Sequence, residues 1–146
     1  MQFPTLISSD PEKVFIVARN VSAATVSAGK AVEFDAETVT DGNAVTQAKS
    51  GSKSGLFAGI TKDAMVDSAY GLVQVYGFCA SAYCSFQSAN TIAIGDFLRP
   101  VSGNLEDMTL SAATTSGHIW VSVMDSVAAA AAISVVSYRP VFIRAL

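Results

Sequence analysis

Residues 72–86 read LVQVYGFCASAYCSF, and this stretch sets the expected fold class. From Leu72 to Tyr76, apolar side chains alternate with Gln74, which is the two-residue period of a half-buried β-strand. Residues 79–86 keep the same β-like character. Gly77 leaves two arrangements open: the second half is a hairpin partner of the first, or one strand continues past a bulge.

Short segments of the same kind lie on both sides of this stretch, with turn signals every 8–12 residues or so. Pro140 predicts an edge strand or a break near the end of the chain. Residues 62–67 and 128–132 are compatible with single helical turns. We therefore predict an all-β sandwich or barrel of about seven to nine short strands with at most one or two short helical turns. The other predicted strands are residues 14–17, 31–35, 56–60, 108–110, 118–124, 133–138 and 141–144.

The first residues of the chain differ from the rest. Residues 1–12 show no periodicity, and we predict that they form an extended arm in front of a single domain, residues 13–146. The arm carries the apolar residues Phe3, Leu6 and Ile7. These side chains either dock onto another molecule or pack against their own domain.

Residues 36–55 form the most polar stretch of the chain. Their second part, residues 49–55, is a low-complexity run of Ser, Gly and Lys without the Gly-Lys-Ser/Thr ending of a phosphate-binding loop. We predict an exposed loop here. Lys49 and Lys53 should then point into solvent and tolerate charge reversal.

The composition favours a protein that binds other proteins. Hydrophobic residues make up 51% of the 146 residues and charged residues only 14%, against an average of about 25% charged. A surface with few charges suits an interface, so the composition indicates an oligomer or a coat. The net charge is −3 and none of the nine Lys and Arg residues are adjacent, which argues against a nucleic-acid partner.

No segment of the sequence resembles an export signal or a membrane span. Residues 1–10 lack the basic and apolar regions of a signal peptide. The longest apolar run, residues 127–136, is far shorter than the roughly 20 residues that cross a bilayer. We expect an intracellular protein, or one that reaches the outside by assembly and lysis rather than by export, without a membrane partner.

The sequence contains no recognisable catalytic or metal-binding set. His118 is the only histidine and begins an apolar strand, so a Ser-His-Asp arrangement is not expected. The carboxylate pairs Glu33/Asp35 and Asp63/Asp67 lie beside predicted loops, where we expect them to provide solubility. We predict no enzymatic activity, no metal and no cofactor.

Three further features have a structural and a functional interpretation. Cys79 and Cys84 are five residues apart, so in a regular strand they point to opposite faces and should not form a mutual disulfide. Asn20 begins a glycosylation triplet, which we expect to be unused. The aromatic residues either belong to the core or form a sugar-binding platform. They are Tyr76, Phe78, Tyr83, Phe86 and Trp120.

Four short segments mark turns and strand faces. They are VSAGKAV at residues 26–32, FAGI at 57–60, GLVQVYG at 71–77 and IGDFL at 94–98. Together these segments resemble tailed-bacteriophage capsid decoration (cement) proteins. The resemblance implies a compact β-barrel or β-tulip-like domain that forms homotrimers on the exterior of the virion. Its partner would be the major capsid protein, whose neighbouring subunits it cements together.

The arm has a possible role in this setting. An extended segment can add a strand to an exposed sheet edge of the capsid through main-chain hydrogen bonds. We hypothesise that residues 1–12 dock in this way, with Phe3, Leu6 and Ile7 as contacts. The alternatives are a head-fibre or tail-tip module that binds a receptor or glycan, and another virion assembly component.

Overall fold

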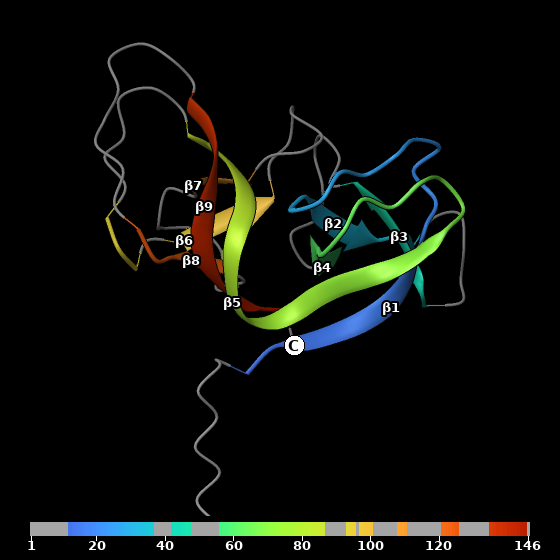
Figure 1. Ribbon diagram of the computed structural model, residues 1–146, viewed down its shortest axis with the longest axis horizontal. Helices are drawn as coiled ribbons and strands as arrows, with labels where there is room; N and C mark the ends of the chain where they lie inside the picture. The colour runs from blue at the N-terminus through green and yellow to red at the C-terminus, as the bar shows by residue number, and fades with distance from the viewer. Residues whose placement is uncertain are drawn as a thin grey trace, which may run out of the picture.

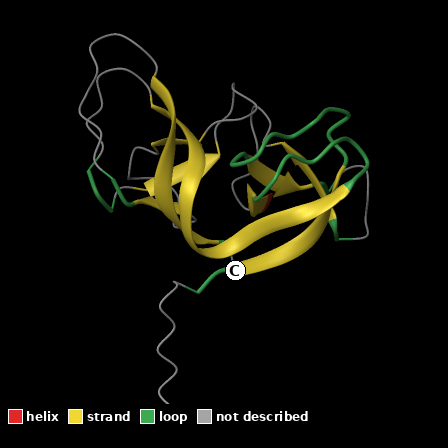
Figure 2. Ribbon diagram, viewed as in Figure 1, coloured by secondary structure: helices red, strands yellow, loops and turns green. Residues whose placement is uncertain are grey.

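The computed structural model describes residues 12–36, 42–47, 56–86, 93–95, 97–100, 108–110, 121–125 and 135–145. Within these ranges the chain is built from β-strands (Figure 2). The strands are β1 (Val14–Asn20), β2 (Ala31–Phe34), β3 (Ala44–Gln47), β4 (Phe57–Thr61), β5 (Tyr70–Phe86), β6 (Phe97–Pro100), β7 (Met108–Leu110), β8 (Val121–Val123) and β9 (Val135–Arg144).

The strands join into one sheet that closes on itself twice, and β5 belongs to both closed circuits (Figure 1). The first circuit runs β1-β3-β2-β4-β5 and closes through the pairing of β1 with β5. The second runs β5-β7-β6-β8-β9 and closes through the pairing of β9 with β5. The prediction of an all-β barrel is therefore confirmed. At Gly77, one long strand continues and no hairpin forms.

Gly77 marks the point where β5 passes from one circuit to the other. β5 pairs with β1 up to Tyr76 and with β9 from Tyr76 onward. Gly77 has φ +98°, a conformation that L side chains rarely adopt. A Cβ atom at this position would also overlap the backbone carbonyl oxygen of Glu12. Glycine is required here for both reasons.

A second irregularity in β5 explains how a proline fits inside β9. Cys79 pairs with Val141 and Ala82 with Arg139, so β5 has one more residue than β9 between these pairs. Pro140, which has no N–H to donate, lies opposite this bulge, and its carbonyl accepts a bond from Met124 N at 3.0 Å. The expected break or edge strand was therefore wrong, because β9 runs through the proline with partners on both sides.

The same bulge overturns the prediction that the two cysteines point to opposite faces. Cys79 pairs with Val141 and Cys84 with Ser137, four residues earlier on β9, so the extra residue returns both cysteines to one face of β5. Both thiols are free.

The prediction of an exposed loop over residues 36–55 was wrong in its middle. Residues 44–47 form β3, which is buried along its whole length and lies between β1 and β2. Val45 is fully buried, and the polar Thr46 and Gln47 are buried with it. The sequence pattern did not indicate this strand, because it is short and has polar segments on both sides. Lys49 and Lys53 lie outside the described residues.

The described residues form two buried apolar clusters. One lies in the first circuit: Ala18, Val26, Val32, Val45, Ala58, Met65 and Val73. The other joins the second circuit to β2 and β4: Ala31, Phe57, Ile60, Ala82, Cys84, Leu98, Val121, Val123, Val141 and Ile143. A bulge at Gly59 (φ +144°) shifts the β2–β4 register, so Ala58 joins one cluster while Phe57 and Ile60 join the other. The two circuits are thus packed together as well as covalently joined.

Asn20 is a buried structural residue at the end of β1. Its side-chain Nδ2 donates to the carbonyls of Ala24 and Met65, both at 2.8 Å. Its Oδ1 accepts from the backbone N–H of Ser22 at 3.0 Å. Because the side chain is 0% exposed and fully bonded, it fastens two loops and leaves no room for a glycan.

Substitution of Gly77 should destabilise the fold more than substitution of a glycine with matching φ in open space. Gly95 has φ +93°, and no atom of the described residues lies within 4 Å of the position that a Cβ would take there. We expect Gly77→Ala and Gly95→Ala each to lose about 1–2 kcal/mol from backbone strain. Gly77→Ala should lose roughly 1–3 kcal/mol more from overlap with the Glu12 carbonyl. Equal free energies of unfolding in urea titrations of the two variants would contradict this role of Gly77.

Candidate functional site

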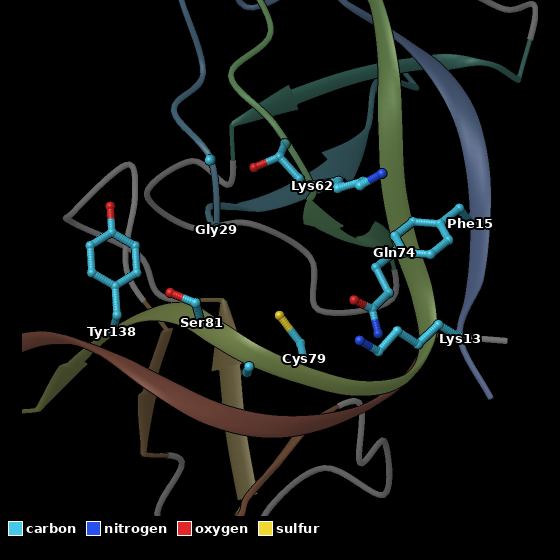
Figure 3. Close-up of a pocket in the computed structure, with 11 residues that line it drawn as sticks. Lys13, Phe15, Gly29, Lys62, Gln74, Cys79, Ser81 and Tyr138 are labelled. Carbon is cyan, nitrogen blue, oxygen red and sulfur yellow. The ribbon is translucent and has the colours of Figure 1, made fainter. Parts of the chain in front are cut away.

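A cavity of about 460 Å³ lies where β5 bends between the two circuits (Figure 3). Its walls come from the start of β1, the turn at Ala28 and Gly29, the end of β4, the middle of β5, and β9. The side chains that give it chemical character are Lys13, Phe15, Lys62, Gln74, Cys79 and Tyr138. A cavity of this size falls in the range of about 300–1,000 Å³ typical of binding pockets.

The turn at Gly29 closes one side of the pocket because it is bonded to both circuits. Gly29 N donates to the Thr61 carbonyl on β4 at 2.9 Å, and the Gly29 carbonyl accepts from Tyr83 N on β5 at 2.8 Å. Gly29 has φ +77°, and a Cβ there would lie 2.6 Å from the Ser81 carbonyl oxygen. The close approach of this turn to the bulge in β5 therefore depends on glycine.

The Gln74 side chain stabilises the bend of β5 through hydrogen bonds to the backbone on both sides of Gly77. Its side-chain Nε2 donates to the carbonyls of Tyr76 (3.2 Å) and Phe78 (3.1 Å), which flank Gly77. The side chain is buried, with 6% of its surface exposed. The floor of the pocket is therefore fixed before any ligand arrives.

A stack of three side chains supports the wall formed by Tyr138. The Tyr83 and Tyr138 rings meet edge to face, with centroids 5.2 Å apart. Lys30 is buried, and its Nζ lies 2.9 Å from the centroid of the Tyr83 ring. A cation over a ring is most favourable where water is excluded, so this stack stiffens the seam between the circuits.

The pocket carries positive charge. Among the described residues that line it, Lys13 and Lys62 are charged and no carboxylate is present. In Figure 3 their ammonium groups lie on either side of Phe15 and Gln74. The Lys62 ammonium is 5.7 Å from the centroid of the Phe15 ring. The arrangement suits a ligand with an anionic group and an apolar body.

The pKa of the Cys79 thiol reflects both burial and charge in this pocket. Burial raises the pKa of its thiol, while a backbone hydrogen bond at Ser81 and the charge of Lys13 oppose the rise. The neutral thiol is therefore the dominant form at neutral pH, and Cys79 acts as part of the apolar wall.

The residues singled out from sequence do not gather at this pocket. Phe3, Leu6, Ile7, His118 and Trp120 lie outside the described residues. Glu33 is buried in β2, and Asp67 accepts a hydrogen bond from Ala23 N at 3.0 Å. Tyr76 and Phe78 are half-buried on β5. In the described part of the chain, no cluster of three His, Cys, Asp or Glu residues could hold a metal ion.

The sequence offered no signal for the pocket. Lys13, Lys62 and Cys79 belong to separate segments and become neighbours only through the closure of the first circuit and the bend of β5.

Comparison with known proteins adds no assignment. No protein-family model matches the chain, and no curated protein matches it in sequence. No helix among the described residues is long and apolar enough to span a membrane.

The two cysteines should differ sharply in reactivity. Cys79 is partly exposed in the pocket, whereas Cys84 is 0% exposed in the core. We expect one thiol of the native protein to react with neutral dithiodipyridine, with a pH midpoint above the ordinary thiol value of about 8.5. Lys13→Met should move this midpoint higher, because it removes a charge that favours the thiolate.

Cys79→Ser is the control and should remove the reaction of the native protein. A midpoint that falls in Lys13→Met would contradict the proximity of Lys13 to the thiol.

Proposed function

We propose that this chain is a structural protein of a tailed-bacteriophage virion. In this proposal it binds the outer surface of the capsid as a homotrimer and cements neighbouring major capsid subunits. The proposal rests first on the resemblance of residues 26–32, 57–60, 71–77 and 94–98 to capsid decoration proteins.

The observation that carries most weight is the surface of the first circuit. Val17 on β1 and Tyr70 on β5 are 60% and 67% exposed. Val17 pairs with Leu72 and Arg19 with Tyr70, so these side chains share the outer face of the β1–β5 pair. Large exposed apolar side chains on one face support a protein-binding role.

The closed sheet is consistent with a protein present in many copies. Each of the described strands has a pairing partner on both sides over at least part of its length, so none of them is an edge strand along its whole length. Contacts with a shell would then use side chains and the arm. Weak contacts repeated over many sites can give tight overall binding through avidity.

Co-sedimentation with purified capsids of the source phage tests this function. We expect the chain to be a trimer by light scattering and to pellet with capsids in many copies per shell. A monomer that stays in the supernatant would refute the proposal.

Removal of residues 1–11 tests the arm and keeps Glu12 beside Gly77. We expect the truncated chain to keep the unfolding midpoint of the full chain and to lose most of its capsid binding, because the strand added by the arm is absent. Full retention of binding would contradict the docking role of Phe3, Leu6 and Ile7.

A receptor- or glycan-binding module of a head fibre or tail tip is the second candidate. The Tyr76 and Phe142 rings meet edge to face with centroids 5.5 Å apart, and the Arg144 guanidinium lies 5.6 Å from the Phe142 centroid. All three residues lie at the pairing of β5 with β9. Aromatic side chains of this kind can stack on sugars. A few copies per particle and a positive glycan screen would favour this function over a coat.

A further inference from the structure

We propose that the pocket at the bend of β5 binds an extended acidic segment of the capsid protein. Carboxylates of this segment pair with the ammonium groups of Lys13 and Lys62, and a neighbouring apolar side chain packs on Phe15, which lies between the two lysines. This inference rests on the proposed function and names the chemistry by which the domain recognises its partner.

The distribution of charge around the pocket favours an anionic partner. The chain has nine basic and twelve acidic residues, yet two exposed lysines converge on one pocket. No described residue forms a salt bridge with either ammonium group, and no described carboxylate lines the cavity. Two cations in one pocket with no described carboxylate beside them favour an anionic occupant by charge complementarity.

The walls of the pocket are partly apolar and are held rigidly. Phe15 and Cys79 are half-buried and supply apolar surface beside the two lysines. Gln74 fixes the bend through two hydrogen bonds, and the Gly29 turn is bonded to both circuits. A preformed pocket loses little conformational entropy when it binds, so a short segment can be held without large rearrangement.

The weakness of each charge interaction favours a partner that presents the same segment many times. Charge interactions of exposed ammonium groups are weak because water screens them, so two of them cannot retain a free small anion. The same interaction becomes effective when a trimer presents several pockets to a repeating lattice. Two lysines are also far fewer than the phosphate contacts of a nucleic-acid site. The pocket therefore fits a segment repeated on a protein shell.

Two charge-reversed double variants test this inference in the same co-sedimentation assay. Lys13→Glu with Lys62→Glu changes the pocket. Lys49→Glu with Lys53→Glu changes the net charge equally within the predicted solvent loop. We expect the affinity of the pocket variant for capsids to fall by about tenfold or more, while the loop variant binds like the unchanged protein.

The outcomes separate the two proposals. If the unchanged protein binds capsids and both variants bind equally well, the function stands and the pocket inference is overturned. If the unchanged protein does not bind, the proposed function falls, and with it the choice of partner. Equal losses in both variants would also overturn the inference, because they would show an effect of net charge alone.

The thiol of Cys79 gives a readout that needs no capsid. Its thiolate attacks an aromatic disulfide and releases the second half of the reagent as a thiolate. Dithiobis-nitrobenzoate carries carboxylates, whereas dithiodipyridine is neutral. We expect the ratio of the two rates, anionic over neutral, to fall about tenfold in the pocket variant and to stay constant in the loop variant. An unchanged ratio in the pocket variant would overturn the anion preference of the site.

Capsids should also protect Cys79 from the neutral reagent in the unchanged protein. Reaction of Cys79 at the same rate on bound and free protein would overturn the inference. So would protection that grows with protein concentration in the absence of capsids, because it would assign the pocket to a segment of a second copy.

Discussion

Strand β5 must satisfy two closed circuits at once, and the rest of the structure depends on how it does so. A regular strand continues in one direction, so it cannot close two separate rings on its two halves without a bend. Gly77 supplies that bend with a positive φ, and Gln74 holds it through the carbonyls of Tyr76 and Phe78. The bulge that follows realigns β5 with β9 opposite Pro140. These irregularities also create the pocket, because they open a space between two circuits that are otherwise packed together.

The bend of β5 also brings together the contacts that hold the two circuits to each other. The cluster that includes Phe57 and Ile60 joins β4 to the interior of the second circuit, and the Gly29 turn bonds to Thr61 and Tyr83. Lys30 is buried against Tyr83, where the ring stabilises a cation that is shielded from water. The two circuits are therefore held as one unit, and the walls of the pocket keep their separation. A rigid pocket with two cations at its mouth suits recognition through many weak, repeated contacts.

The local periodicity of the sequence predicted the all-β class and the positions of most strands, because alternation is a property of neighbouring residues. It missed β3, whose four buried residues lie between polar flanks, and it divided β9 at Pro140. Both errors have the same cause: pairing partners distant in sequence decide whether a short or interrupted segment becomes a strand. The faces of Cys79 and Cys84 depended on a bulge that no residue pattern announced. The pocket could not be predicted at all, because Lys13, Lys62 and Cys79 meet only after the first circuit closes and β5 bends.

The functional account makes the bend of β5 the place where the domain meets its partner, with the exposed apolar face of β1 and β5 beside it. A cryo-electron microscopy map of capsids decorated with the full-length chain tests this most directly. The account predicts trimers on the outer surface, with an extended capsid segment inside the pocket and acidic side chains beside Lys13 and Lys62. A map in which the domain contacts the shell through other surfaces, with solvent filling the pocket, would contradict it.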